Sequence, residues 1–256
     1  MIPPAVDRFL LERLPPRLSM HYRSYQTWRW GDPEIKLLSY LCDRHRDSID
    51  VGPFWGMYTY HMRRLSRRCI AVEPSPEARA LLRQNIGKGV TVLPFALSCT
   101  SGKAFMRVPE RSGKTETALG TIEDLNVFSG SPVKTFEVEV STIDIIAPDN
   151  VGFIKIDVEG HELSVLRGAK RIIVRDRPNM IIELEERHRP GAIDSTIKFL
   201  FGYGYDCHFL FDGKLRPIVD FSLSEHQSLE ATGKPYINNF IFTAGRRHKK
   251  LMERFS

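Results

Sequence analysis

The chain has 256 residues, 42% of them hydrophobic and 27% charged, which is the composition of one ordinary globular domain with or without an appended segment. It contains no apolar run long enough for a transmembrane helix, and its opening, MIPPAVDRFLLERLPPR, lacks the apolar stretch of a secretory signal. The net charge of +6 comes largely from basic patches such as 63–68 and 245–250, which we interpret as solvated surface. We therefore expect no nucleic-acid partner and no stable membrane insertion. Peripheral contact with an anionic membrane is the open alternative.

The first 47 residues are rich in arginine, leucine, aromatic residues and proline. They predict two short helices, about 5–14 and 33–45. An irregular loop containing Trp28 and Trp30 is expected between them.

From residue 48 onward, strand-like and helix-like segments alternate. Strands are predicted at 48–52, 68–74, 89–98, 152–160, 178–186, 205–211 and 235–244, and helices at 57–67, 75–86, 161–174 and 192–202. Two further strands, 103–108 and 133–142, enclose a polar stretch at 109–132 that exceeds the usual loop length and is expected to be mobile or to cover a substrate. This order predicts a three-layer α/β fold with a mainly parallel sheet and helices on both faces.

The four cysteines, Cys42, Cys69, Cys99 and Cys207, are scattered along the chain. Their spacing predicts neither a zinc site nor a disulfide framework. We therefore expect a reduced, cytoplasmic protein.

The first predicted strand runs into the segment IDVGPFWGMYTYH, which is typical of the ligand-binding loop beside the first strand of a parallel sheet. Glu73 ends the second strand, 23 residues after Asp50, close to the spacing at which an acid binds the ribose diol of a cofactor. NAD and S-adenosylmethionine are the two natural candidates. The pattern is DxGxxxG rather than GxGxxG, and Phe54 and Pro53 are poor partners for a pyrophosphate, so the loop favours S-adenosylmethionine.

A second group of ionisable residues follows a predicted strand in VGFIKIDVEGHELSVLRGA. Asp157 is expected at the ligand-binding edge of the sheet, with Glu159, His161 and Glu162 at the turn into the next helix. Charged groups at such an edge are costly to bury unless they do chemistry or cap a helix. We assign a functional role to Asp157, whereas Glu162 is interpreted as a residue that favours the helix start.

Seven segments, in this order, resemble the FkbM-type methyltransferases: DVGPFWGMYT, IAVEPSPEARALLRQNI, ALSCTSG, STIDII, FIKIDVEGHELSVLRGA, IIELEE and YINNFIF. The resemblance covers roughly residues 48–243, and IKIDVEGHE with the following VLRGA is its most specific part. It implies the class I S-adenosylmethionine-dependent fold, a Rossmann-like three-layer α/β architecture with a mainly parallel seven-stranded sheet, an antiparallel last strand and additional N-terminal helices. It also implies methylation of a hydroxyl group, often on a sugar or a polyketide-type product.

The resemblance also implies site residues and a division of the chain. Carried over by position, Asp50, Gly52 and Gly56 form the cofactor loop, Glu73 holds the ribose, and Asp157 and Glu159 face the transfer site. The full set expected to bind S-adenosyl-L-methionine is Asp50, Gly52, Gly56, Tyr58, Glu73, Pro74, Ser75, Ala96 and Asp157. We expect residues 1–47 to form a substrate cap, 48–245 the methyltransferase domain and 246–256 a basic tail.

Two departures from the family pattern stand out. The family loop usually reads DVGANIG, whereas this chain has Pro53, Phe54 and Trp55 in place of a small, a polar and an aliphatic residue. Cys99 stands where an aspartate is common, which affects the expected contacts on the adenine side.

Transfer of a methyl group to an alcohol needs a base near the acceptor. The expected catalytic residues are Asp157, Glu159, His161 and Glu183, with His161 and Asp157 as the preferred bases; His188 is interpreted as a solvated loop residue. The same four residues form the alternative of a Mg²⁺ or Mn²⁺ site, but no tight ligand motif supports it, so no metal is expected.

The expected function is O-methylation of a sugar in a glycan, glycolipid or lipo-oligosaccharide, in its narrowest form 2-O-methylation of fucose on a nodulation-type signalling molecule. The alternatives are a polyketide-type acceptor, an NAD-dependent oxidoreductase and a methyltransferase-like binding module without catalysis. Phe54 and the lack of a Tyr-x-x-x-Lys set disfavour the oxidoreductase, and the Pro53-Phe54-Trp55 sequence is the best support for the binding module. The aromatic residues Trp28, Trp30, Phe54, Trp55 and Tyr58 fit either stacking on a sugar ring or core packing.

Overall fold

The computed structural model describes residues 14–111, 114–116, 119–123, 132–147, 149–228, 236–244, 251 and 253–255. The helix predicted at 5–14, the basic patch at 245–250 and much of the polar stretch at 109–132 lie outside these residues. In the ranges that are described, no helix combines the length and apolar composition needed to cross a membrane.

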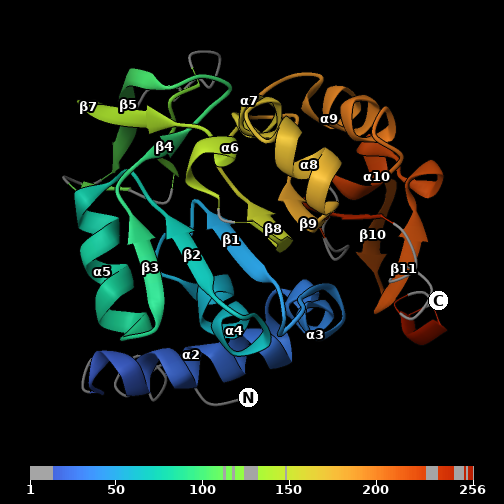
Figure 1. Cartoon of the computed structure of the whole chain (residues 1–256), viewed down its shortest axis with the longest axis horizontal. Helices are drawn as coiled ribbons and strands as arrows, with labels where there is room; N and C mark the ends of the chain where they lie inside the picture. The colour runs from blue at the N-terminus through green and yellow to red at the C-terminus, as the bar shows by residue number, and fades with distance from the viewer. Residues whose placement is uncertain are drawn as a thin grey trace.

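An eight-stranded sheet forms the centre of the molecule, in the order β11-β10-β12-β9-β8-β1-β2-β3 (Figure 1). The strands are β1 Asp47–Val51, β2 Cys69–Val72, β3 Val90–Leu93, β8 Val151–Ile156, β9 Asn179–Glu183, β10 Asp206–Phe211, β11 Lys214–Pro217 and β12 Asn239–Thr243. The block from β3 to β9 is parallel, β12 runs antiparallel to β9 and to β10, and β11 runs antiparallel to β10. The predicted mainly parallel α/β sheet with an antiparallel last strand is confirmed.

The predicted number of seven strands is one too few, because β11 forms a hairpin with β10. Asp212 and Gly213 make the turn between them, with φ angles of 50° and 75°. A two-residue turn with two positive φ angles matches the twist of an antiparallel pair, and Asp-Gly is a favoured sequence for it. The Asp-Gly pair was therefore the sequence signal for this extra strand.

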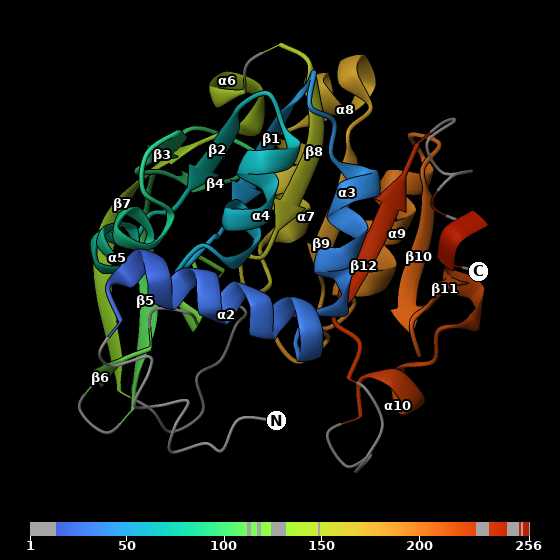
Figure 2. The same ribbon diagram turned by 90° about the horizontal axis from the view of Figure 1, so that it is seen from below.

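Helices cover both faces of the sheet (Figures 1 and 2). One face carries α2 Pro16–Trp30, η1 Pro33–Leu37, α3 Leu38–Leu41, α4 Met57–Leu65 and α5 Pro76–Ile86. The other carries α6 Ile143–Ile146, α7 Glu162–Arg167, α8 Lys170–Asp176, α9 Ala192–Phe201, η3 Ile218–Asp220 and α10 Leu223–His226. Two apolar layers, one under each set of helices, make up most of the buried core.

A smaller sheet lies beyond the carboxyl ends of β2 and β3 (Figure 1). Its strands, β4 Ala96–Leu97, β5 Gly102–Arg111, β6 Lys114–Thr115 and β7 Val133–Ser141, lie in the order β4-β7-β5-β6. β5 and β7 are the two strands predicted on either side of the polar stretch, and they pair antiparallel over most of their length. The predicted strand at 89–98 is divided, since β3 joins the main sheet and β4 joins this one.

The N-terminal segment differs from the prediction. The loop expected around Trp28 is instead helical, because α2 extends from Pro16 to Trp30. Pro16 occupies the first helical position, where its missing N–H costs nothing, so the proline starts this helix and does not break it. The helix predicted at 33–45 is shorter, and consists of η1 followed by α3, which ends at Leu41.

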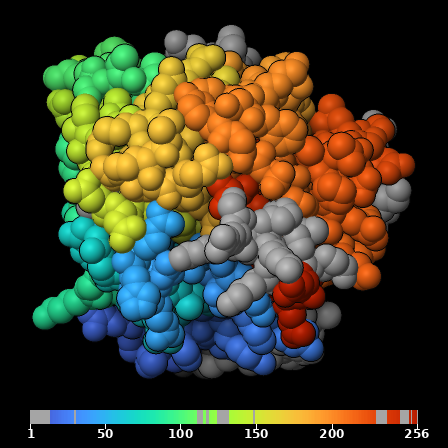
Figure 3. All heavy atoms as spheres, turned by 45° about the vertical axis from the view of Figure 1, so that its right-hand side comes forward, coloured from blue at the N-terminus to red at the C-terminus, as the bar shows by residue number. Residues whose placement is uncertain are grey.

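The C-terminal residues pack against this N-terminal segment. Leu251 is buried in the apolar layer beneath α3, and the ring of Phe255 lies 5.4 Å from that of Tyr40. Figure 3 shows the C-terminal residues, in red, beside the blue N-terminal helices.

The helices after β2 and β8 begin where the sequence predicts, but the second is broken. Ser75 caps α5 by accepting a hydrogen bond from the backbone N–H of Ala78, and Pro76 follows as the first helical residue. The single helix predicted at 161–174 is two helices, α7 and α8, which meet at Gly168. A side-chain carbon on Gly168 would lie 2.1 Å from the carbonyl oxygen of Ser98, so this junction packs directly against the chain after β4.

Candidate functional site

A cavity of about 180 Å³ opens at the carboxyl ends of β1, β2 and β8. Its walls come from the loop after β1, the end of β2, the smaller sheet and the turn after β8. The lining residues are Val51, Gly52, Phe54, Val72, Glu73, Pro74, Phe95, Ala96, Leu97, Met106, Gly120, Thr121, Ile122, Asp157, Val158, Glu159 and His161. This is the edge at which open α/β sheets bind ligands. The volume is below the range of about 300–1,000 Å³ for drug-sized ligands, so the enclosed part suits one portion of such a ligand, for example a nucleoside.

The loop after β1 depends on glycine. Gly52 has a φ of 74°, and a side-chain carbon there would lie 1.8 Å from the carbonyl oxygen of Asp157. No other residue fits this contact, because the obstacle is rigid backbone from the neighbouring strand. Gly56 also has a positive φ, 97°, and immediately precedes α4. The loop therefore passes tightly over the end of β8 and leaves space beside it.

Glu73 brings a buried carboxyl to the same cavity. It is 5% exposed, and its Oε1 accepts a 2.9 Å hydrogen bond from the backbone N–H of Ser75. Burial raises the pKa of Glu73 and the hydrogen bonds from Ser75 and Phe54 lower it, which leaves a pKa of about 7. The same cavity also has apolar lining residues, among them Leu97 and Met106. An acid beside an apolar slot suits a ligand that combines a diol with a flat ring.

The residues expected to bind the cofactor fall into two groups. Gly52, Glu73, Pro74, Ala96 and Asp157 line the cavity, whereas Asp50, Gly56, Tyr58 and Ser75 do not. Asp50 is buried and accepts a hydrogen bond of 2.5 Å from Thr59 Oγ1, and Ser75 orients Glu73.

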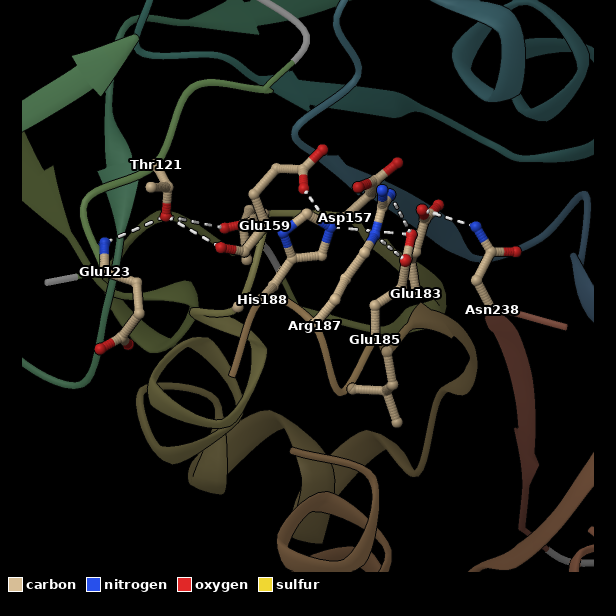
Figure 4. A network of polar contacts seen from close by, with 12 residues as sticks. Thr121, Glu123, Asp157, Glu159, Glu183, Glu185, Arg187, His188 and Asn238 are labelled. Carbon is tan, nitrogen blue, oxygen red and sulfur yellow. Dashed lines mark hydrogen bonds and ion pairs between the residues drawn. The ribbon is translucent and has the colours of Figure 1, made fainter. Parts of the chain in front are cut away.

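Two carboxyls meet where β8 and β9 end. Glu183, the last residue of β9, accepts a 2.7 Å hydrogen bond from Asn238 Nδ2 (Figure 4). It also interacts with Asp157, which follows β8. Burial, followed by the neighbouring Asp157, raises the pKa of Glu183 far above its ordinary value. The raised pKa keeps Glu183 protonated at neutral pH. Glu183 then donates to Asp157, whose other lone pairs remain available on a side chain that is 35% exposed.

A buried lysine completes this cluster. Lys155 is 2% exposed, and its Nζ lies 3.8 Å from Asp157 Oδ2 and 3.9 Å from Glu183 Oε2. The same ammonium lies 5.0 Å from the centre of the Tyr58 ring. Burial by itself lowers the pKa of Lys155, but the surrounding carboxylates, Asp157 first, more than offset this effect and raise it. The lysine is therefore charged and balances the acids at the strand ends.

Sequence reasoning missed Lys155, although a signal was present. The segment FIKID places one charged residue in a strand whose other residues are apolar, and alternation along the strand puts Phe153 and Lys155 on the same face. That face is the one covered by η1, α3 and α4. A charged residue in a fully buried parallel strand indicates a partner charge nearby.

His161 lies on the cofactor side of the site. Its Nδ1 is 3.0 Å from Glu123 Oε2, and its Nε2 is 2.9 Å from Ser98 Oγ. Both ring nitrogens therefore have partners, and the side chain is 13% exposed. Glu123 comes from the polar stretch at 109–132, where no motif pointed to it.

Glu159 is held by a histidine outside the cofactor cavity (Figure 4). Its backbone is left-handed, with φ 53°, and its Oε2 lies 2.9 Å from His188 Nε2. Burial lowers the pKa of His188, but hydrogen bonds to Glu159 and Glu185 outweigh it and raise that pKa to about 10. The interpretation of His188 as a solvated loop residue is wrong, because its side chain is 13% exposed and paired with acids. A histidine that stays protonated at neutral pH is no general base.

Glu162 serves the turn itself, as predicted. It is 3% exposed, and its Oε1 accepts hydrogen bonds of 2.9 Å from the backbone N–H of Gly160 and 3.4 Å from that of Val158. Burial raises its pKa to about 7. Its position at the start of α7 fixes the turn that carries Glu159 and His161.

The four residues considered for a metal point to different partners. Glu159 pairs with His188, His161 with Glu123, and Glu183 with Asp157 and Asn238. Among the described histidine, cysteine, aspartate and glutamate residues, no group of three or more is arranged to hold a metal ion.

Residues 45–207 match the family model of the methyltransferase FkbM domain. The fold is similar to the crystal structure of a methyltransferase FkbM from Methylobacillus flagellatus KT, with a TM-score of 0.51 and 18% identity over 92% of this chain and 57% of that one. It is also similar to a methyltransferase-like protein from Streptococcus mutans, solved in complex with SAH (S-adenosylhomocysteine), with a TM-score of 0.50 and 12% identity over 83% of this chain and 96% of that one. At these identities the two structures establish the fold.

The chain spans little more than half the length of the Methylobacillus protein, 57% of it. No curated protein matches the sequence at a significant level.

Proposed function

The chain belongs to the FkbM methyltransferase family, whose domain matches residues 45–207, and from this premise we propose that it is an S-adenosylmethionine-dependent O-methyltransferase that acts on a sugar hydroxyl. The observation that carries the proposal is the position of the Asp157–Glu183–Lys155 cluster at the rim of a cavity that also holds Gly52 and Glu73. The cavity suits the cofactor, and the cluster suits deprotonation of an alcohol.

The residues of the cavity fit S-adenosylmethionine. Glu73 offers a buried carboxyl for a ribose diol, and the missing side chain of Gly52 leaves room beside the end of β8. Phe54 lines the cavity where a dinucleotide loop would need glycine, which suits a cofactor without phosphate. When bound, this cofactor supplies a methyl group that its sulfonium sulfur makes electrophilic.

The acids at the strand ends orient and deprotonate the acceptor. Asp157 accepts the proton of the attacking hydroxyl, because Glu183 already carries its own proton and donates it toward Asp157. Lys155, 3.8 Å away, holds the Asp157 carboxylate in place. Positioning of reactants contributes up to about 7–11 kcal/mol in well-oriented systems, and general-base catalysis contributes about 10²–10⁴-fold in rate.

The N-terminal segment, residues 1–47, is proposed as the substrate cap of the domain at 48–245, with 246–256 as its basic tail. Support comes from η1, which packs on the same face of the sheet as Lys155. The acceptor is proposed to be a sugar in a glycan, glycolipid or lipo-oligosaccharide, with fucose O-2 as the narrowest form.

The function is tested with isotope-labelled S-adenosylmethionine and a panel of glycosides, glycolipids, lipo-oligosaccharides and polyketide-type alcohols. We expect label on a sugar hydroxyl, detected by mass spectrometry, and we expect calorimetry to show binding of S-adenosylhomocysteine but not of NAD. Absence of S-adenosylhomocysteine binding would contradict the cofactor assignment. Label found on the polyketide-type alcohols alone would contradict the sugar.

The pKa of Glu73 predicts how cofactor affinity depends on pH. The hydroxyls of a ribose donate to the ionised carboxyl, so binding lowers a pKa that is about 7 in the free protein. Affinity for S-adenosylhomocysteine is therefore expected to rise by about tenfold from pH 6 to pH 8 and then to level off, which corresponds to about 1.4 kcal/mol of binding free energy. Calorimetry across this range measures it.

Glu73→Gln provides the control for this pH dependence. The glutamine keeps the shape of the side chain but cannot ionise, so the variant should bind more weakly and show a flat profile. An equally steep profile in the variant would mean that another group is responsible.

A further inference from the structure

A second cavity lies across the acid cluster from the first. It has a volume of about 400 Å³, within the range of about 300–1,000 Å³ typical of ligand pockets. The lining residues are Gly31, Asp32, Pro33, Glu34, Leu210, Asp212, Gly213, Tyr236, Ile237, Asn238 and Asn239. They come from η1 and the two residues before it, from the end of β10 and the β10–β11 turn, and from the start of β12 and the three residues before it. None of these segments contributes to the first cavity.

Two asparagines link this cavity to the acids. Asn239 Nδ2 donates a 3.3 Å hydrogen bond to Asn238 Oδ1, and Asn238 Nδ2 donates one of 2.7 Å to Glu183 Oε1. Glu183 is hydrogen-bonded to Asp157, and Asp157 lines the first cavity. The carboxyl pair therefore links the two cavities, with Asp157 in the wall of the first and Asn238, bonded to Glu183, in the wall of the second, as a cofactor site and an acceptor site would be linked.

The side-chain oxygen of Asn239, in the wall of this cavity, lacks a hydrogen-bond donor among the described residues. The residue is 6% exposed, yet its Oδ1 has no hydrogen-bond partner among the described residues. The bond from its Nδ2 to Asn238 fixes the orientation of the amide, so the free atom is the acceptor oxygen. A buried carbonyl oxygen without a donor destabilises the folded protein, and a hydroxyl donor from a ligand would relieve this cost.

The charges of the wall limit the ligand further. Asp32, Glu34 and Asp212 contribute carboxyl groups, and none of the described lining residues is a lysine, arginine or histidine. Glu34 is 5% exposed, and burial raises its pKa to about 7, so it can both donate and accept near neutral pH. Tyr236 presents its ring, since its hydroxyl donates to Glu185 Oε2 at 2.8 Å. Burial raises the pKa of Asp32 and Glu34, and the ammonium of Lys155 lowers it in part. That ammonium is buried and does not line the cavity, so the wall itself presents carboxyl groups that disfavour anions and suit a molecule rich in hydroxyl donors.

We propose that this cavity is the acceptor site and that its ligand is a neutral, polyhydroxylated molecule, namely a sugar ring without carboxylate, phosphate or sulfate. The proposal rests on the function proposed above and narrows it, because it selects uncharged sugars and assigns their recognition to Asn239 and Asp212.

The test uses the full chain saturated with S-adenosylhomocysteine and ligand-detected saturation-transfer NMR. The probes are methyl α-L-fucopyranoside, methyl β-D-glucopyranoside and methyl β-D-glucuronide, of which the last two differ by one carboxylate. We expect at least one neutral glycoside to bind, and the glucuronide to bind at least about tenfold more weakly than the glucoside, as a repulsion of about 1.4 kcal/mol would give.

Two variants locate the site. Asn239→Leu should weaken binding of the neutral glycosides about tenfold, as the loss of one hydrogen bond of about 1.4 kcal/mol gives. Asp212→Lys, on the exposed turn, should reduce the discrimination against the glucuronide, whereas the matched change Asp220→Lys in η3, outside the cavity, should not. Unchanged S-adenosylhomocysteine affinity shows that each variant is folded.

Three results would overturn the proposal. The unmodified protein could bind the glucuronide as tightly as the glucoside, or it could bind neither of the two neutral glycosides. The variants Asp212→Lys and Asp220→Lys could also have equal effects. The failure of the proposed function is separate. If labelled methyl groups reach a sugar while Asn239→Leu and Asp212→Lys leave its KM unchanged, the function stands and this site is wrong. If no methyl transfer is detected with any acceptor, the proposed function itself fails.

Discussion

Replacing Asp157 with asparagine is expected to lower kcat for methyl transfer by about 10²–10⁴-fold, the range that a general base contributes. Asparagine has the size of aspartate but cannot take up the hydroxyl proton. The backbone of Asp157 donates a 3.0 Å hydrogen bond to the carbonyl of Val51, and the substitution leaves this bond intact. Cofactor affinity should therefore change little. Single-turnover kinetics with labelled cofactor, together with calorimetry, separates the two quantities.

The matched comparison is His161→Gln, which tests the rival base. Both nitrogens of His161 already have partners, Glu123 and Ser98, so its loss should act mainly on the cofactor side and raise KM for S-adenosylmethionine more than it lowers kcat. If kcat fell by less than tenfold in Asp157→Asn but collapsed in His161→Gln, the assignment of the base would have to be reversed.

The cofactor cavity could be foreseen in outline because it depends on where neighbouring parallel strands end. Gly52 follows β1 and Glu73 follows β2, and these two strands are neighbours in the sheet. Because the carboxyl ends of neighbouring parallel strands meet at one edge, the ends of the predicted strands were enough to place both residues at one cavity. The pairing of Asp157 with Glu183 follows from the adjacency of β8 and β9 by the same reasoning. The helix start at Ser75 was predictable for a different reason, since capping involves residues only three apart.

The remaining parts of the site depend on contacts between distant segments. Asn238 meets Glu183 across 55 residues because β12 returns antiparallel beside β9, and Glu123 meets His161 from a polar stretch without periodicity. His188 looked solvated because its neighbours in EERHRP are charged, but the fold directs it between two acids. The helix α2 was missed because prolines and aromatics obscured a segment in which apolar and polar residues do not separate into faces.

Replacing Lys155 with methionine is expected to lower the free energy of unfolding by about 3–5 kcal/mol, the usual cost of removing one partner from a buried ion pair. Methionine fills a similar volume, so the loss is electrostatic: Asp157 and Glu183 keep their positions but lose the ammonium that lies 3.8 and 3.9 Å away. Without it, the pKa of Glu183 in the folded state rises further. A carboxyl whose folded-state pKa is raised keeps its full stability contribution only below its unfolded-state pKa and loses it as pH rises. Glu183 keeps its proton between pH 5 and pH 8 with or without the lysine, so the deficit should stay nearly constant in that range and grow above the pKa of about 9 that Glu183 has beside Lys155, as measured by urea unfolding.

Two further variants separate charge from packing. Lys103→Met removes the lysine of a surface pair with Glu137, whose side chains are 58% and 51% exposed, and should cost less than about 1 kcal/mol. The double variant Lys155→Met with Glu183→Gln should regain the part of the stability that is lost above about pH 9, because it removes a carboxyl that would otherwise ionise without a counter-ion. If Lys155→Met were as mild as Lys103→Met, or if its deficit did not grow between pH 8 and pH 10, the lysine would be a packing residue. The acids at the ends of β8 and β9 would then need no counter-ion from this lysine. The presence of a lysine in an otherwise apolar strand would need a cause outside this cluster.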